Sequence, residues 1–308
     1  MKPDQQPSVI WVLDDGKPGH RNQSLGLAEA IERLVGAEIH LVTLPHPSGL
    51  FSRIKSVRAQ ARSLAQPQLI IAAGHRTHLP LIYLAHKTKA RSVVLMRPSL
   101  PLGWFDRCLI PEHDFRRGDD VPAHVMLTKG ALNRVQHDPE AKSNSGLFLI
   151  GGESKEFGFD GDKLHSEVRE IVEQDTEREW ILTDSRRTPG DFIRTLDDGC
   201  IALHPHQGTS PEWLPGQLRL ASVVWVTEDS VSMIYEALSS GARVGLLPMP
   251  RINKPGRVAA GIESLVQDGM ICRYEEWQQS REMPGGEKVL AEAERCGKAI
   301  IEDLLRKL

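Results

Sequence analysis

The sequence predicts an α/β protein of two Rossmann-like domains, each built on a parallel sheet. Short apolar runs of strand length alternate with helical patterns, and the alternation starts again after a polar break at residues 136–146. The apolar runs are continuous, which is typical of parallel strands that are buried on both faces. A length of 308 residues also suits two domains. We expect domains over residues 1–140 and 146–285, and a final helix over 286–308 that packs back on the first domain.

In the first half, apolar runs predict strands at residues 9–13, 39–43, 69–73 and 92–96, with shorter candidates at 108–110 and 125–128. Leu27, Ile31 and Leu34 recur at helical spacing, and Asn22 or Ser24 is the expected cap of that helix. Residues 14–20 are therefore expected to form a loop. A second amphipathic helix is predicted by five apolar residues: Leu50, Ile54, Val57, Ala61 and Leu64.

In the second half, strands are predicted at residues 147–150, 180–183, 200–204, 223–226 and 243–247. Leu164, Val168 and Ile171 predict a helix between the first two of these strands. Thr188 as a cap followed by Pro189 predicts a further helix start. Residues 230–239 read as a helix that ends at Gly241, and residues 287–307 as a polar C-terminal helix.

Composition indicates an ordinary soluble protein, with 40% hydrophobic and 26% charged residues. The net charge of -3 gives no overall basic field, so we expect no nucleic-acid partner, although a local basic patch is compatible with it. The apolar runs are far shorter than the ~20 residues of a membrane-spanning helix, and residues 1–8 show no secretory signal. We expect a cytoplasmic protein, and peripheral attachment to the inner membrane face stays open.

Glycine, hydroxyl and basic side chains follow several of the predicted strands. In open α/β sheets, ligands bind at the carboxyl ends of the strands. Glycine permits close backbone approach, helix N-termini bind phosphate, and arginine offers forked donors for phosphate oxygens. The sequence therefore predicts a phosphorylated ligand, with these candidate residues: Gly16, Lys17, Gly19, Gly74, His75, Arg76, Gly151, Gly152, Ser185, Arg186, Arg187, Ser230 and Ser232. Turn glycines, solvated arginines and a capping serine are the plainer alternatives.

His20 is the candidate catalyst, because it ends a glycine-rich segment after the first strand and imidazole titrates near neutral pH. His75 and His78 stand three apart but no third ligand has suggestive spacing, so no metal site is expected. The chain has no G-x-G-x-x-G after its first strand, no Walker A motif and no G-x-S-x-G elbow. This argues against a dinucleotide dehydrogenase, a P-loop NTPase and an α/β-hydrolase, and no cofactor is expected.

Residues 12–24 resemble the opening of the family named for the plant mitochondrial-fission factor, the elongated-mitochondria protein. Gly151-Gly152 and the segments 185–189 and 227–233 also look like that family. Its bacterial members are often labelled predicted nucleoside-diphosphate-sugar epimerases. The resemblance covers most of residues 9–270, and the plant relatives recruit a dynamin-like GTPase in organelle fission.

A more distant resemblance is to GT-B glycosyltransferases, especially the transferase that adds N-acetylglucosamine in peptidoglycan synthesis. Gly16–His20 approximates that family's first loop, whereas Gly74-His75-Arg76 has fewer glycines than its second. The donor-binding domain of that family has a segment ending in a glutamate, then a glycine and an apolar strand that runs into a proline. A similar order is found here in Glu236, Gly241 and Pro248. The resemblance implies a GT-B architecture, with two Rossmann-like domains facing a central cleft.

By this resemblance, the second domain binds a nucleotide diphosphate sugar, which is a substrate and not a cofactor. Glu236 would accept hydrogen bonds from the ribose, and Ser230, Ser232 and Met233 would offer backbone N–H groups to the diphosphate. Arg186 and Arg187 would stabilise the leaving diphosphate without a metal, and His20 would be the general base on an acceptor hydroxyl.

The acceptor stays open, and it could be membrane-associated. A nucleoside-diphosphate-sugar epimerase is one alternative to the glycosyltransferase. A non-catalytic scaffold that binds a protein partner is the other.

Overall fold

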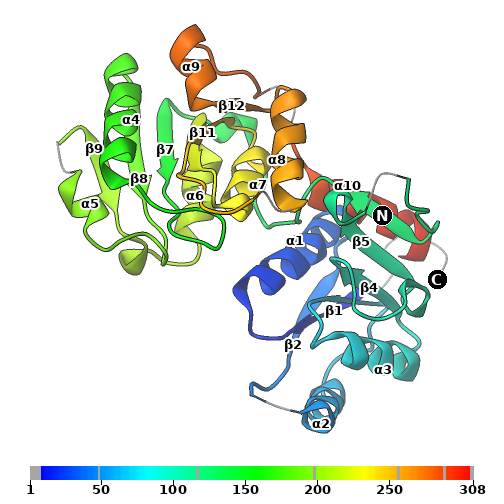
Figure 1. Cartoon of the computed structure of the whole chain (residues 1–308). Coiled ribbons are helices and arrows are strands. Elements are labelled where there is room, and N and C mark those ends of the chain that lie inside the picture. Colours follow the sequence, from blue (N-terminus) through cyan, green and yellow to red (C-terminus); the bar gives the residue numbers. More distant parts are fainter. Residues whose placement is uncertain are drawn as a thin grey trace. The chain divides into compact units, whose positions relative to one another are not determined.

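The computed structural model describes residues 8–47, 49–115, 118–196, 199–254, 257–286 and 289–305. The chain divides into two compact units, which are described separately. Unit 1 consists of Met1–Arg134 and Ala291–Leu308, and unit 2 of Val135–Leu290 (Figure 1). The expectations for residues 1–7, and for 287–288 and 306–308 of the last helix, lie outside the described residues.

Unit 1 contains a six-stranded, all-parallel sheet with the order β2-β1-β3-β4-β5-β6. Its strands are β1 (Val9–Asp14), β2 (Glu38–Thr43), β3 (Leu69–Ala73), β4 (Arg91–Leu95), β5 (Arg107–Pro111) and β6 (Val125–Thr128). Its α-helices are α1 (Pro18–Val35), α2 (Leu50–Ala61), α3 (His78–Thr88) and α10 (Glu292–Ile300). Short 3-10 turns lie at Leu102–Trp104 and Glu112–Asp114.

Helices cover both faces of this sheet, which is why its strands read as continuous apolar runs. Ile10 and Val12 of β1 pack with α1 and α10 on one face. Trp11 and Leu13 point to the other face and pack with α2 and α3. All six residues of β1 are buried.

The C-terminal helix α10 packs on α1 within unit 1. Cys296, Ile300 and the following π-turn at Ile301–Leu305 join the core on the α1 face. At Gly297 the two helices are close neighbours, since an ideal Cβ there would make ordinary contacts at 3.5 Å with Ala30 and with Ile31. Unit 1 is therefore built from both ends of the chain.

Unit 2 contains a second six-stranded, all-parallel sheet, with the order β12-β11-β10-β7-β8-β9. Its strands are β7 (Ser145–Leu149), β8 (Glu179–Thr183), β9 (Ile201–His204), β10 (Val223–Thr227), β11 (Arg243–Leu247) and β12 (Ile271–Arg273). Its α-helices are α4 (Gly161–Gln174), α5 (Phe192–Thr195), α6 (Trp213–Leu220), α7 (Val231–Ser239), α8 (Arg257–Gln267) and α9 (Tyr274–Ser280). Short 3-10 turns lie at Pro139–Ala141 and His206–Gly208.

Each sheet has one topological switch point, where successive strands are added in opposite directions. In unit 1 the switch lies between β1 and β3, and in unit 2 between β7 and β10. The loops that leave such a strand pair diverge to opposite faces, which opens a crevice at the carboxyl edge. The fold thus marks two places for a ligand, one in each unit.

Three expected helix starts are wrong. The final helix, expected over residues 286–308, begins as α10 at Glu292. α1 begins at Pro18 instead of beside Asn22 or Ser24, because proline suits the first helical position. His20 therefore lies in a helical turn and not in a loop. The predicted helix start at Thr188 and Pro189 is absent, since α5 begins at Phe192. The Thr188 hydroxyl donates to the Ile150 carbonyl instead, at 3.0 Å, so tertiary contacts use the group that would have capped a helix.

Among the described residues, no helix is both long enough and apolar enough to cross a membrane. This agrees with the short apolar runs of the sequence.

Glu167 of α4 makes the stability of unit 2 depend on pH. It is 4% exposed and one of its carboxylate oxygens has no hydrogen-bond partner. Burial raises the pKa of Glu167 to about 7, against the weaker opposing effect of Lys163. A carboxyl group whose pKa is raised by folding contributes fully to the free energy of unfolding below its unfolded pKa, near 4.5. This contribution is lost as pH rises through the folded pKa of about 7.

We therefore expect Glu167→Gln to stabilise the protein at pH 8, by roughly 2–3 kcal/mol, and to have little effect near pH 4.5. Thermal unfolding at both pH values measures the difference. Glu173→Gln, on the exposed side of the same helix, is the matched control. Equal effects of Glu167→Gln at the two pH values would contradict a raised pKa.

Candidate functional site

The carboxyl edge of unit 1 holds a histidine–aspartate pair at its switch point. Asp15 directly follows β1, and its side chain is fully buried. Both of its carboxylate oxygens lie 3.1 Å from Nδ1 of His20, whose side chain is 20% exposed. Because the Asp15 carboxylate accepts a hydrogen bond from Nδ1–H, the lone pair is placed on Nε2. This arrangement suits a general base that is held in one orientation.

The neighbouring strand makes room for this pair with a glycine. Gly74 follows β3 at a φ of +88°, where a side chain is strained. An ideal Cβ there would lie 2.3 Å from the ring of His20 and 3.2 Å from Asp15. Gly74 thus serves the packing of His20 against the sheet edge.

The segment between β1 and α1 wraps around two carboxylates. The backbone N–H of Gly16 donates to Asp14 at 2.9 Å, and that of Lys17 donates to Asp15 at 3.2 Å. Gly16 has a φ of +83°, a conformation that favours glycine. Packing does not require glycine there, since no atom lies within 4 Å of an added Cβ. Gly19 has equally open surroundings and the Lys17 side chain is exposed. These residues leave space beside His20.

The other predicted residues of unit 1 differ in their surroundings. His75 is exposed, whereas the Arg76 guanidinium donates to the Pro45 carbonyl at 2.8 Å and braces the segment after β2. His78 is buried, and this burial, with the nearby His75 and His20, lowers its pKa to about 4. His78 is therefore neutral at physiological pH. No group of His, Cys, Asp and Glu suited to a metal ion occurs in the part of the chain that the structure describes.

In unit 2, Gly151 and Gly152 leave β7 at the switch point and pack against the loop after β10. The Gly151 N–H donates to the Thr227 hydroxyl at 2.7 Å, and the Gly152 N–H to Asp229 at 3.1 Å. An ideal Cβ at Gly151 would lie 2.2 Å from Asp229, and one at Gly152 would lie 2.0 Å from the Arg187 carbonyl. Both glycines permit close packing, and their N–H groups are used within the unit.

Arg187 ties three loops of this edge together. Its guanidinium lies 2.6 Å from Asp229, and it donates to the Ser230 hydroxyl at 3.2 Å. It also donates to the Gly152 and Glu153 carbonyls at 3.1 and 3.2 Å. The Asp229 side chain is fully buried and one of its oxygens has no hydrogen-bond partner. Arg187 therefore neutralises Asp229 and positions the edge.

Ser185 and Arg186 occupy the turn that carries Arg187. The Ser185 hydroxyl accepts from the Arg187 N–H at 3.2 Å and lies 3.1 Å from the Thr188 hydroxyl. Ser185 is thus used to shape the turn. Arg186 is exposed, so its guanidinium is the one of the pair that can turn toward a ligand.

The N-terminus of α7 lies beside this turn and has no side-chain cap. Ser230 is the N-cap residue, but its hydroxyl donates to Asp229 at 3.1 Å instead of accepting from the first helical turn. Ser232 is exposed, and the Met233 side chain packs on the core. The backbone N–H groups of both residues belong to the first turn of α7. Glu236 is half-buried one turn further along α7. Uncapped N–H groups at a helix N-terminus attract an anion such as phosphate.

The aspartates that hold these sites were not predicted from the sequence. Asp15 directly precedes Gly16 and Asp229 directly precedes Ser230, both of them predicted site residues. An acidic residue next to an apolar strand was the signal that could have identified each aspartate.

A second pair joins Asp184, after β8, to His206, after β9. The His206 Nδ1 lies 2.9 Å from Asp184, and the His206 N–H donates to the same oxygen at 2.7 Å. No sequence spacing links these two residues.

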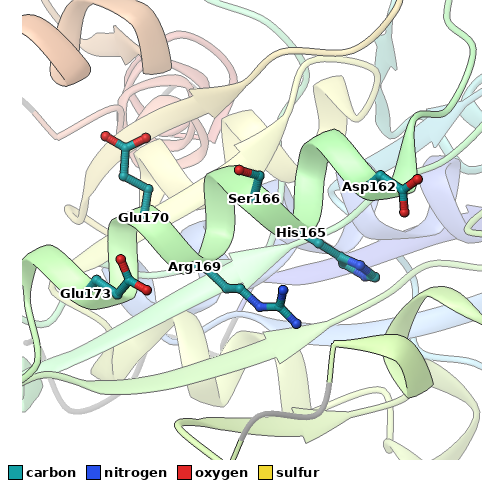
Figure 2. Close-up of a pocket in the computed structure, with 6 residues that line it drawn as sticks. All are labelled: Asp162, His165, Ser166, Arg169, Glu170 and Glu173. Atoms are coloured by element: carbon teal, nitrogen blue, oxygen red, sulfur yellow. The ribbon is translucent and has the colours of Figure 1, made fainter.

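Two hollows on the surface of unit 2 lie away from the candidate site. One runs along α4, and Figure 2 shows its six lining side chains on that single helix: Asp162, His165, Ser166, Arg169, Glu170 and Glu173. Another, of about 200 Å³, is lined by Trp180, Val223 and Arg243 at the starts of β8, β10 and β11. It therefore opens at the amino edge of the sheet. Neither hollow contains a residue of the candidate site.

Comparison with solved structures shows a GT-B fold. A putative UDP-N-acetylglucosamine 2-epimerase from Listeria monocytogenes is similar with a TM-score of 0.58 and 13% identity, over 98% of each chain. MurG of Acinetobacter baumannii has a TM-score of 0.53 and 9% identity, over 97% of this chain and 100% of that chain. UGT71G1 of Medicago truncatula, complexed with UDP-glucose, has a TM-score of 0.50 and 10% identity, over 96% and 94%.

Sequence comparison gives the family. An uncharacterised protein of Rickettsia prowazekii (strain Madrid E) is 24% identical, over 79% of this chain and 84% of that protein. The family described as Mitochondrial fission ELM1 matches residues 18–304, which include α1 with His20 and the whole carboxyl edge of unit 2. Since this match spans nearly the entire chain, the protein belongs to the Mitochondrial fission ELM1 family.

Proposed function

We propose that the protein binds a nucleotide diphosphate sugar at the carboxyl edge of unit 2 and is a metal-independent glycosyltransferase. The observation that carries the proposal is the uncapped N-terminus of α7 at the β7–β10 switch point, beside the exposed Arg186. Helix N–H groups and a guanidinium together suit a diphosphate. The complex of the Medicago truncatula structure with UDP-glucose makes a uridine nucleotide the first to test.

Each unit has a separate part in the proposed reaction. In unit 2, the first N–H groups of α7 and Arg186 stabilise the charge on the leaving nucleotide diphosphate. Glu236, one turn along α7, accepts hydrogen bonds from the ribose hydroxyls. In unit 1, Nε2 of His20 takes the proton of an acceptor hydroxyl. The acceptor oxygen then forms the bond to the anomeric carbon as the bond to the diphosphate breaks.

A nucleoside-diphosphate-sugar epimerase is the second candidate, and the TM-score of 0.58 with a putative epimerase favours it. An epimerase needs no acceptor. Sugar analysis after incubation without an acceptor separates the two, because only an epimerase then gives an altered sugar nucleotide. A non-catalytic scaffold that recruits a protein partner is the alternative if no nucleotide binds.

The first prediction is nucleotide binding itself. In a thermal-shift screen against UDP, GDP, ADP, dTDP, CMP and their sugar conjugates, we expect one nucleotide class to raise the melting temperature. A ligand at 100 times its Kd adds about 2.7 kcal/mol, which corresponds to several degrees. No shift with any of these ligands, from folded protein, would refute the donor site and favour the scaffold.

The second prediction concerns Glu236. Glu236→Ala removes a charged acceptor, worth about 1.5–3 kcal/mol, so the Kd for the nucleotide is expected to rise about tenfold or more while the melting temperature of the free protein changes little. Isothermal titration measures the Kd. Glu177→Ala replaces an exposed carboxylate elsewhere in unit 2 and is the control. Normal binding by Glu236→Ala would remove this residue from the site.

Substitutions of His20 and Asp15 test their separate roles, His20 as the base and Asp15 as the residue that positions it. His20→Ala is expected to lower kcat by about 10²–10⁴ with the nucleotide Kd unchanged. Asp15→Asn presents an amide N–H to Nδ1, which shifts the proton to Nε2, and is expected to lower kcat while KM is retained. Steady-state kinetics with His86→Ala, an exposed histidine of α3, is the control. Full activity of His20→Ala would exclude it as the base.

A further inference from the structure

Unit 1 contains a long stretch of chain without a single acidic residue. Residues 39–105 hold nine Lys and Arg and no Asp or Glu, although the whole chain has 41 acidic against 38 basic residues. The stretch runs from β2 to the segment before β5 and includes α2 and α3. The net charge of -3 therefore conceals a strongly basic part of unit 1.

The basic charge of α2 is gathered on one exposed face. Phe51, Lys55, Arg58 and Arg62 follow one another at intervals of four, three and four residues, which places them on one side of a helix. All four are exposed. Val57, on the opposite side, is the residue of α2 that is buried. Helix α2 thus buries little apolar area against the core. The four exposed residues named above form a mostly basic row on the surface, the α2 stripe.

Large apolar side chains are exposed at the start of this stripe. Phe51 is 92% exposed, and Leu50 beside it is 37% exposed. Leu79, in the first turn of α3, is 42% exposed. The Arg53 guanidinium donates to the Arg76 carbonyl at 2.8 Å, which links the first turn of α2 to the loop before α3. The apolar residues therefore gather at the carboxyl edge of the sheet of unit 1.

We propose that this surface, the α2 stripe with Leu50 and Leu79, docks on an anionic membrane. A helix that lies in a membrane interface combines aromatic and aliphatic side chains with Lys and Arg. The absence of carboxylates from residues 39–105 removes the repulsion that an anionic lipid surface would otherwise meet. A nucleic-acid surface would account for the charges but not for an almost fully exposed Phe51. The inference does not depend on the proposed chemistry of the protein.

The apolar end of the docking surface lies at the same edge of the sheet as the candidate base. α2 follows β2, and β2 pairs with β1, which leads to Asp15 and His20. Membrane docking through α2 would bring the carboxyl edge of unit 1 to the lipid surface, so that an acceptor held in the membrane could reach it.

The test is co-sedimentation of the full chain with vesicles of phosphatidylcholine, with and without phosphatidylglycerol. We expect binding to the vesicles that contain phosphatidylglycerol, and a decrease as salt is added. Neutralising the stripe with Lys55→Gln, Arg58→Gln and Arg62→Gln is expected to weaken partitioning by about a hundredfold, since each basic residue contributes about fivefold. Phe51→Ser is expected to weaken it by about tenfold.

Matched variants in unit 2 are the controls. Lys155→Gln, Arg194→Gln and Lys254→Gln remove the same total charge from exposed positions, and Ile252→Ser removes a 60% exposed apolar side chain. These are expected to leave partitioning unchanged. Equal losses in the control and stripe variants, or equal binding to phosphatidylcholine alone, would overturn the proposal. Loss with the charge variant but not with Phe51→Ser would show that charge alone holds the protein to the vesicles, without insertion of Phe51, and would also overturn the proposed docking surface.

Discussion

The parallel direction of all strands in each sheet is the constraint on which the candidate sites depend. Parallel strands need crossover connections, so every segment that follows a strand starts at the same edge. At the switch points between β1 and β3, and between β7 and β10, neighbouring segments also diverge to opposite faces. Glycine, hydroxyl and charged residues that are far apart in the chain are thereby gathered into one small region of each unit.

Buried carboxylates keep these regions in shape. Asp15 fixes the orientation of His20, and Asp229 accepts from Gly152, Ser230 and Arg187. A buried carboxylate is costly unless it is paired, which explains why so many donors converge on Asp229. The ion pair holds three loops in register and leaves the first N–H groups of α7 for a ligand. Its partner Arg187 therefore has a positioning role, whereas Arg186 keeps the exposure that ligand binding requires.

The basic residues on the surface of unit 1 are arranged differently from the charged residues of the two candidate sites. Three of the nine basic side chains of residues 39–105 lie in the α2 stripe, and this stretch of chain contains no carboxylate of its own. The two histidines His75 and His78 belong to the same stretch, and burial keeps His78 neutral. The polar residues at the carboxyl edge and the basic residues of α2 thus belong to the same unit but to different parts of its surface.

The sequence by itself determined the organisation into two α/β halves, because strands buried on both faces must be continuously apolar. Every predicted run became a strand, whereas β12 was not predicted. It also identified the segments that follow these strands. Only the tertiary structure decided what each residue does there. Thr188 looked like a helix cap in the sequence, but its hydroxyl donates to the carbonyl of Ile150, the residue that follows β7. His20 looked like a loop residue, but Pro18 places it in a helix, where Asp15 orients its ring. Gly74, which follows the distant strand β3, leaves the space that this ring occupies. Local patterns follow from the chain's own chemistry, whereas the partner of a side chain depends on which distant segments the sheet brings together.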